Sequence, residues 1–343
     1  MIQGIDQNNI YSGLHQSHVS FVAEQMCKHT ILHNRKNKRC HLKLEINSLY
    51  PCVFTTMISY TDYQKKNFLD KQSHFQMLKE CELSEKDFSY LKIYCKKKKI
   101  DFISSAGDVN SFKFLKKIGM NIFKLASADI TDFFLNRYLS SIKKNIIIST
   151  GMSNMNEIKE SLKFYKKISK NKICLMHCVS NYPCKNESLN LNILPVLKKL
   201  GYVVGFSDHT NSNVAAICSL ALGAKIFEKH FTLNKNMKGP DHKASIDYPE
   251  LKKYVKDLRE TQKSLGRAIK ECQQEEKQMK LISRKSIFTN KVITKNSKIK
   301  ISDICFKRPG TGLSPMRIKN VLNKVAKSTI PAETQLSLKL LKN

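Results

Sequence analysis

Short apolar runs alternate with amphipathic stretches along the chain from about residue 80 onward. Runs of about four to six mainly apolar residues are typical of buried strands, and apolar residues at intervals of three and four are typical of helices packed on one face. The runs that predict strands are residues 101–105, 122–125, 145–149, 173–177, 203–207 and 225–230. The stretches that predict helices include residues 84–95, 154–167, 192–200, 212–222 and 249–265. This order predicts repeated βα units with parallel strands.

The predicted strand ends recur about every 25 residues, which suits one βα unit. Six such units in a row favour a closed (β/α)8 barrel, with an open parallel sheet as the alternative, and two more strands are expected over residues 19–24 and 51–55. In a βα barrel the active site forms where the strands run into the following loops. These positions carry Ser, Lys, Asp and His, so the pattern predicts an enzyme.

The pattern changes after Leu265. A charged helical linker extends to about residue 280, and short β-like runs then surround the turn Arg308-Pro-Gly-Thr-Gly-Leu-Ser-Pro315. About 60 residues are enough for a small independent domain. The predicted organisation is a barrel over residues 1–266, a linker over 267–283 and a β-rich domain over 284–343.

The formal net charge is +32, from 60 lysines and arginines against 28 acidic residues, and only eight of the 60 are arginines. Nucleic-acid surfaces favour arginine beside stacking aromatic residues, whereas these lysines are spread through helical stretches with many Asn and Ile residues. A lysine-rich coding composition therefore explains the charge better than a nucleic-acid partner, and we expect no such partner.

The apolar runs, the first residues and the cysteines indicate the cellular compartment of the protein. The longest apolar runs are far shorter than the roughly 20 residues of a membrane span, so a membrane protein is not expected. Residues 1–14 lack the order of a secretory signal, and the eleven cysteines contain no Cys-x-x-Cys pair. These features predict a cytoplasmic protein with reduced thiols and argue against a structural zinc site.

Two histidines stand at or just past predicted strand ends. His209 and His230 are one βα unit apart. If their strands are neighbours, both imidazoles project over the same rim and can share a divalent ion such as Mn²⁺, completed by water and substrate oxygens. Spacing alone leaves the alternative open that each is a hydrogen-bonded structural histidine.

Two further strand ends predict an anion site. Lys124, with Ser127 close behind it, and Ser149 supply an ammonium group and hydroxyls. Phosphate binds well where such groups converge with backbone N–H groups, although an ordinary surface lysine and a turn serine remain the alternative. Other polar groups expected on this rim are the hydroxyls of Ser105, Ser180 and Ser207. Asp241 follows the last strand on a turn, where its carboxylate could bind sugar hydroxyls, although Pro-Asp is also common in ordinary turns.

Eight motifs carry a resemblance to a known family. Those at or just past the predicted strand ends are Phe102-Ile-Ser-Ser105, Phe123-Lys-Leu-Ala-Ser127, Ser149-Thr-Gly-Met-Ser153, His177-Cys178 with Tyr182-Pro183, Gly205-Phe-Ser-Asp-His-Thr210 and Glu228-Lys-His-Phe-Thr232. The other two lie on turns and are Gly239-Pro-Asp-His242 and, in the C-terminal region, Arg308-Pro-Gly-Thr-Gly312. In order and spacing they resemble the N-acetylneuraminate (sialic acid) synthase family, which includes the legionaminic and pseudaminic acid synthases. The resemblance runs from about residue 63 to the C-terminus.

The resemblance implies a (β/α)8 TIM barrel followed by a small antifreeze-like (SAF) domain, in a domain-swapped homodimer. It implies condensation of phosphoenolpyruvate with an N-acetylmannosamine-type sugar and water, releasing phosphate, with Mn²⁺, or else Mg²⁺ or Co²⁺, on His209 and His230. It places Asp129 and Asp241 on sugar hydroxyls and Arg308, from the partner's SAF domain, on the N-acyl group. The residues that it places around phosphoenolpyruvate are Lys124, Ser127, Ser105, Ser149, Ser180 and Ser207.

Residues 1–62 depart from the family pattern. The family usually begins with Ala-Glu-Ile-Gly-x-Asn-His-x-Gly, and residues 23–31 keep the glutamate, Glu24, and the histidine but neither glycine. Glu24 is the remaining catalytic residue that the resemblance implies. The lysine of the family's Val-Lys-Phe-Gln, which binds phosphoenolpyruvate, has no counterpart near Val53. These losses leave open a catalytically impaired homologue that binds a sugar or a protein partner.

Overall fold

The computed structural model describes residues 83–97, 101–237 and 241–342. Contacts between Cα atoms divide the chain into two compact units, Met1–Gly266 and Arg267–Asn343. Within the described residues, none of the helices is both long and apolar enough to cross a bilayer.

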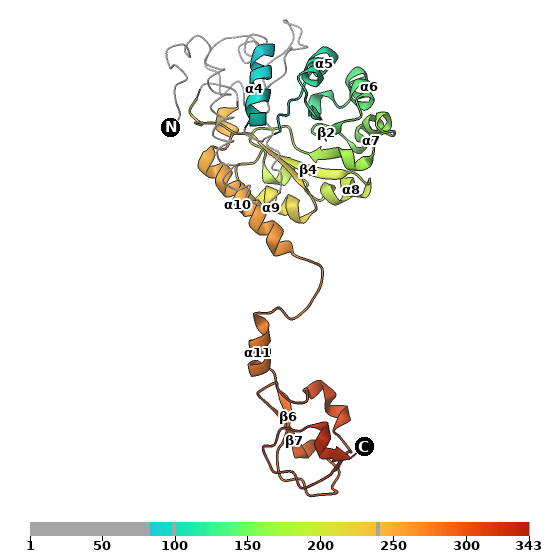
Figure 1. Ribbon diagram of the computed structural model, residues 1–343, viewed down its shortest axis with the longest axis vertical. Coiled ribbons are helices and arrows are strands. Elements are labelled where there is room, and N and C mark those ends of the chain that lie inside the picture. Colours follow the sequence, from blue (N-terminus) through green and yellow to red (C-terminus); the bar gives the residue numbers. More distant parts are fainter. Residues whose placement is uncertain (1–82, 98–100, 238–240, 343) are drawn as a thin grey trace. The chain divides into compact units, whose positions relative to one another are not determined.

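The first unit is built on a curled sheet of five parallel strands, whose order in space is their order in the chain (Figure 1). The strands are β1 (Ile122–Leu125), β2 (Asn145–Ser149), β3 (Ile173–His177), β4 (Val203–Asp208) and β5 (Ile226–Lys229). Their central residues are mostly buried and apolar, which is typical of a parallel sheet covered on both faces. All five strands confirm the sequence prediction to within one residue at each end.

The predicted strand over residues 101–105 is the exception. The segment makes a single parallel bridge, in which Ser105 pairs with Lys124 of β1. The N–H of Ser104 donates to Sδ of Met120, so this part of the segment does not extend the ladder. The strands expected over residues 19–24 and 51–55 lie outside the described residues. The described strands therefore form a half-barrel, and closure to eight strands stays a prediction.

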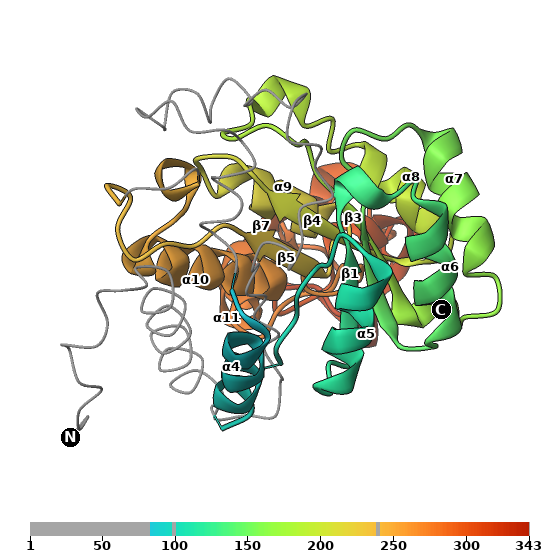
Figure 2. The same cartoon turned by 90° about the horizontal axis from the view of Figure 1, so that it is seen from above.

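Helices connect successive strands and follow one another around the outside of the sheet (Figure 2). They are α4 (Glu85–Lys97), α5 (Val109–Lys117), α6 (Phe133–Ser141), α7 (Met155–Phe164), α8 (Ile193–Lys199), α9 (Val214–Ala221) and α10 (Tyr248–Leu265). Capping boxes begin α7, through Asn154 and Glu157, and α10, through Asp247 and Glu250, and satisfy N–H groups of the first turn. Short 3₁₀ turns are η2 (Ser127–Asp129), η3 (Lys170–Lys172), η4 (Asn186–Ser188) and η5 (His242–Ala244).

The main hydrophobic core lies between the sheet and these helices. Helix α4 buries Phe88, Leu91 and Cys95, the three residues that the sequence pattern puts on one face. The ring of Phe112 on α5 packs 6.0 Å from that of Phe123 on β1. Each large apolar side chain buried here contributes about 1.5–3 kcal/mol relative to an exposed one, so the core holds the strands in place for the site at their carboxyl ends.

The second unit has its own small core. It contains α11 (Glu276–Ser283), the antiparallel pair β6 (Ser286–Thr289) and β7 (Ile304–Lys307), and the antiparallel pair β8 (Val325–Ala326) and β9 (Leu341–Lys342). The turns are η6 (Ile301–Asp303), η7 (Pro315–Asn320) and η8 (Leu338–Leu340). Ile287, Ile299, Val321 and Leu336 are fully buried in one cluster. A β-rich unit with a separate core occupies the region where the sequence predicts a small domain.

Candidate active site at the carboxyl ends of the strands

A buried ion pair crosses the concave side of the half-barrel. Nζ of Lys124 on β1 lies 2.8 Å from Oε1 of Glu228 on β5, and the two side chains are only 4% and 6% exposed. Three strands separate β1 from β5 in the sheet, so this contact requires the sheet to curl. The predicted cation Lys124 is therefore a buried group on the inner face, which rules out the alternative of an ordinary surface lysine.

Glu228 is a site residue that the motif spacing did not single out. Its Oε1 also accepts a hydrogen bond from Oγ of Ser207, at 2.9 Å. Ser207 and Glu228 are register partners on β4 and β5, and register partners in a parallel sheet share a face. The available signal was a carboxylate directly after the two apolar residues of this short strand, two residues before His230.

The pairing register puts several predicted hydroxyls on the same face as Lys124. Lys124 is paired with Ile147, and Ser149 follows two residues later on β2, so it points inward as well. Oγ of Ser149 is buried and has no hydrogen-bond partner within the residues that the structure describes. Leaving a buried hydroxyl without a hydrogen-bond partner costs roughly 1–3 kcal/mol. Binding of an anion that accepts a hydrogen bond from this hydroxyl would remove that cost.

A second group of hydroxyls surrounds Gly151, just beyond β2. Oγ of Ser127 accepts the N–H of Gly151 at 3.1 Å and lies 3.3 Å from Sγ of Cys178. A Cβ at position 151 would lie 2.4 Å from Oγ of Ser180 and 2.8 Å from Oγ of Ser127, so only glycine fits this close approach. Burial raises the pKa of the Cys178 thiol, which keeps it neutral.

The two predicted metal-binding histidines come together at the ends of β4 and β5. The ring centroids of His209 and His230 are 5.5 Å apart. Nδ1 of His209 lies 2.7 Å from the carbonyl oxygen of Val179, to which it donates, and Nε2 lies 3.2 Å from Oγ of Ser207. Tyr182 is part of a sequence motif but was not predicted as a site residue. Its ring lies against both imidazoles, with its centroid 4.2 Å from that of His209 and 5.1 Å from that of His230.

The two histidines could supply part of the ligand set of a divalent ion. A backbone carbonyl that orients the far nitrogen of a histidine is the usual support of a metal ligand, and Val179 supplies it for His209. Nδ1 of His230 lies 4.0 Å from Oδ2 of Asp241. Among the described residues there is no group of three or more His, Cys, Asp or Glu side chains placed to hold a metal, so an ion on the two histidines would need oxygen ligands from elsewhere.

The remaining predicted residues lie in several parts of the chain. Asp129 is partly buried in η2 directly after β1, and burial, then the charge of Asp132, raises its pKa to about 6. Ser105 pairs with Lys124 through the single bridge. Arg308 is exposed in the second unit, where its Nε donates to the carbonyl of Ser283. Glu24, and the position near Val53 that lacks the family's lysine, lie outside the described residues.

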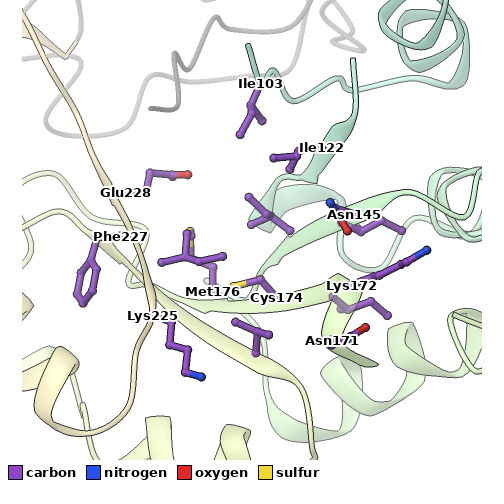
Figure 3. A pocket seen from close by; sticks show the side chains of 15 residues that line it. Ile103, Ile122, Asn145, Asn171, Lys172, Cys174, Met176, Lys225, Phe227 and Glu228 are labelled. Atoms are coloured by element: carbon purple, nitrogen blue, oxygen red, sulfur yellow. The ribbon is translucent and has the colours of Figure 1, made fainter. Parts of the chain in front are cut away.

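The inner face also encloses a cavity of about 390 Å³ (Figure 3). Its walls are mainly apolar side chains from the middle and amino ends of the strands, among them Ile122, Ile147, Cys174, Met176 and Val203. Figure 3 shows Glu228 and Asn145 on opposite sides of it. Glu228 thus lines the cavity and also pairs with Lys124, so the polar rim adjoins an apolar interior.

Comparison with known proteins gives consistent matches. The model of the NeuB family matches residues 50–270. The N,N'-diacetyllegionaminic acid synthase of Campylobacter jejuni is 37% identical over 278 residues, covering 80% of this chain and 83% of that protein. The solved N-acetylneuraminic acid (sialic acid) synthetase of Leptospira borgpetersenii is similar at 26% identity, with a TM-score of 0.62 over 77% of this chain and 85% of that one. The putative spore coat polysaccharide biosynthesis protein E of Chromobacterium violaceum, at 18% identity, shares the fold, with a TM-score of 0.76 over 96% of both chains.

Proposed function

The chain belongs to the NeuB family, and on that premise we propose that it condenses phosphoenolpyruvate with an N-acetylmannosamine-type sugar and water, giving a nonulosonic acid and phosphate. The family match confirms the resemblance carried by the strand-end motifs. Relatives named as legionaminic and pseudaminic acid synthases favour this function over a catalytically impaired binding protein. The proposal includes a cytoplasmic enzyme with a closed (β/α)8 barrel, a C-terminal SAF domain and a domain-swapped homodimer.

The observation that carries the proposal is the convergence of a buried cation and hydroxyls on one rim with two histidines. In this proposal the ammonium group of Lys124 and the hydroxyls of Ser127 and Ser149 bind the phosphate and carboxylate of phosphoenolpyruvate. Charge-assisted hydrogen bonds from a buried ammonium are roughly twice as strong as neutral ones. The hydroxyls of Ser105, Ser180 and Ser207 complete the set around this ligand.

The sugar would bind beside phosphoenolpyruvate. His209 and His230 would hold a divalent ion, Mn²⁺ first among the candidates, which when bound polarises the aldehyde of the open-chain sugar. Carboxylates of Asp129 and Asp241 would accept hydrogen bonds from sugar hydroxyls, and Arg308 of the partner subunit would contact the N-acyl group. Holding the two substrates together in this way lets C3 of phosphoenolpyruvate attack the aldehyde carbon. Water then adds at C2, and phosphate leaves from the same carbon.

The test is release of phosphate by the purified full chain. The protein is incubated with Mn²⁺, phosphoenolpyruvate and either N-acetylmannosamine or its 2,4-diacetamido relatives. We expect Lys124→Met to lose at least about 30-fold in turnover, since truncating one partner of a buried, hydrogen-bonded charge pair at a binding site costs about 2–5 kcal/mol. The matched control is Lys163→Met, which removes a lysine that is 58% exposed on α7 and should leave turnover unchanged. Absence of turnover with every sugar would overturn the synthase proposal, and full metal-dependent activity in His209→Ala would overturn the ligand assignment.

A further inference from the structure

Strands β4 and β5 end in two consecutive polar pairs on opposite faces of the sheet. Ser207 pairs in register with Glu228, and the next register pair is Asp208 with Lys229. Since side chains alternate along a strand, the first pair points into the half-barrel and the second points outward. The outward pair belongs to no part of the anion site or the sugar site described above.

The outward pair is an ion pair buried beneath a helix. Nζ of Lys229 lies 3.1 Å from Oδ2 of Asp208, with the side chains 5% and 0% exposed. The Lys229 ammonium also lies 5.7 Å from the ring centroid of Tyr254, a buried residue of α10. A buried ion pair adds little or no net stability compared with an apolar pair of the same size, so stability alone gives no reason for these two charges.

Both members of the pair also hold the backbone beside a histidine. Oδ1 of Asp208 accepts from the N–H of Thr210 at 2.9 Å and from its hydroxyl at 2.8 Å. Nζ of Lys229 donates to the carbonyl oxygen of Thr210 at 2.5 Å. His209 is the residue between Asp208 and Thr210, so these bonds hold the peptide that follows His209 and the one after it.

The contacts of Asp208 and Lys229 lie where β4 and β5 stop pairing. The β4–β5 ladder ends at the register pair Asp208 and Lys229. The next residues along the two strands are His209 and His230, which lie just past the last register pair. The bond from Lys229 to the carbonyl of Thr210 therefore ties the two strand ends together two residues beyond Asp208, where the ladder ends.

We propose that Asp208 and Lys229 are a positioning pair, which fixes the separation of the His209 and His230 rings and so sets the affinity of the chain for a divalent ion. The inference rests on the metal site of the proposed function. Directional hydrogen bonds perform this task where apolar packing would not, because they specify where Thr210, the residue after His209, lies relative to β5.

The experiment separates folding from metal binding. Mn²⁺ is titrated calorimetrically into chelator-treated full chain without substrates, and stability is measured by urea unfolding. The variants are Lys229→Met, Asp208→Asn, and the two combined. The control is Lys253→Met, which removes an ion pair from a part of α10 where the lysine is 70% exposed.

We expect Lys229→Met to bind Mn²⁺ about 10- to 100-fold more weakly, the usual effect of removing a group that orients metal ligands. The combined variant has no unpaired charge, so it should recover most of the stability that either single variant loses. It should still bind Mn²⁺ weakly, because the bond to the Thr210 carbonyl is absent. Lys253→Met should match the wild type in both measurements.

Two results would overturn the inference, and they are distinguishable. If the wild type binds Mn²⁺ and the combined variant binds it equally tightly, the pair is structural only and the metal site stands. If the wild type binds no Mn²⁺, the metal assignment fails and the inference fails with it. Should Lys229→Met be too unstable to titrate, the combined variant alone decides between these results.

Discussion

Replacement of Glu228 by glutamine should destabilise the first unit while strengthening its affinity for phosphate. Two unit charges 2.8 Å apart attract by about 6 kcal/mol at an effective dielectric constant of about 20. Glutamine keeps an oxygen that can accept from Lys124 and Ser207, so the expected loss is nearer the lower limit for a broken buried pair, about 3 kcal/mol. For a unit of this size that corresponds to a fall in melting temperature of roughly 6–12 °C.

The same replacement should increase the stabilisation that added phosphate gives. In the variant, the buried ammonium of Lys124 has lost its carboxylate, so an added phosphate becomes its counter-ion. Urea unfolding with and without inorganic phosphate should show a larger stabilisation by phosphate in Glu228→Gln than in the wild type.

The control for this experiment is Glu250→Gln. It neutralises a partner in a pair whose side chains are 39% and 44% exposed, and glutamine can still serve in the capping box of α10, so it should cost less than about 1 kcal/mol. Equal stabilisation of Glu228→Gln and the wild type by phosphate would refute the placement of Lys124 in an anion site.

Three other changes have defined outcomes. Gly151→Ala would place a Cβ 2.4 Å from Oγ of Ser180, so phosphate affinity measured by calorimetry should fall at least about tenfold, and an unchanged affinity would argue against this hydroxyl group as the binding site. If Asp129 binds the sugar as proposed, its ionised carboxylate is the form that accepts hydrogen bonds from sugar hydroxyls. The KM for the sugar should then fall as pH rises through about 6, the raised pKa of Asp129, and Asp129→Asn should flatten that profile. The Asp129 carboxyl also binds a proton more tightly in the folded chain than in the unfolded chain. The free energy of unfolding of the wild type, relative to that of Asp129→Asn, should therefore decrease as pH rises from about 4 to 6. A difference in urea unfolding that stays constant over this range would contradict the prediction. Asp108→Ala removes the acceptor for two N–H groups at the start of α5 and should cost about 1 kcal/mol in urea unfolding, whereas Asp108→Asn should cost less.

Strands and helices were predictable from the sequence because each is encoded by residues close to one another in the chain. The apolar run of β2 and the capping residues of α7 are local signals, and the structure places both elements there. The 101–105 segment shows the limit of such signals. It has the composition of a strand, but the N–H of Ser104 donates to Met120, sixteen residues later, which local composition does not reveal.

The site was predictable only in part, for a related reason. Strand ends carrying Lys124, His209 and His230 are visible in the sequence, and the sheet brings them to one rim. The partner of Lys124 is 104 residues away, and its identification requires both the curl of the sheet and the register of β5. Likewise, the contact of Tyr182 with both histidines depends on the path of the loop after β3.

Because the pair Ser207–Glu228 points inward and the pair Asp208–Lys229 points outward, the number of residues in β4 and β5 is constrained. An insertion or deletion of one residue within either strand would exchange its faces, turning Glu228 or Ser207 toward the helices and bringing a charge of the outer pair into the anion site. Both sites would be lost in one event, even though no functional residue had been replaced. Length changes should therefore be confined to the connections on either side of α9, while β4 and β5 keep a constant number of residues among active relatives.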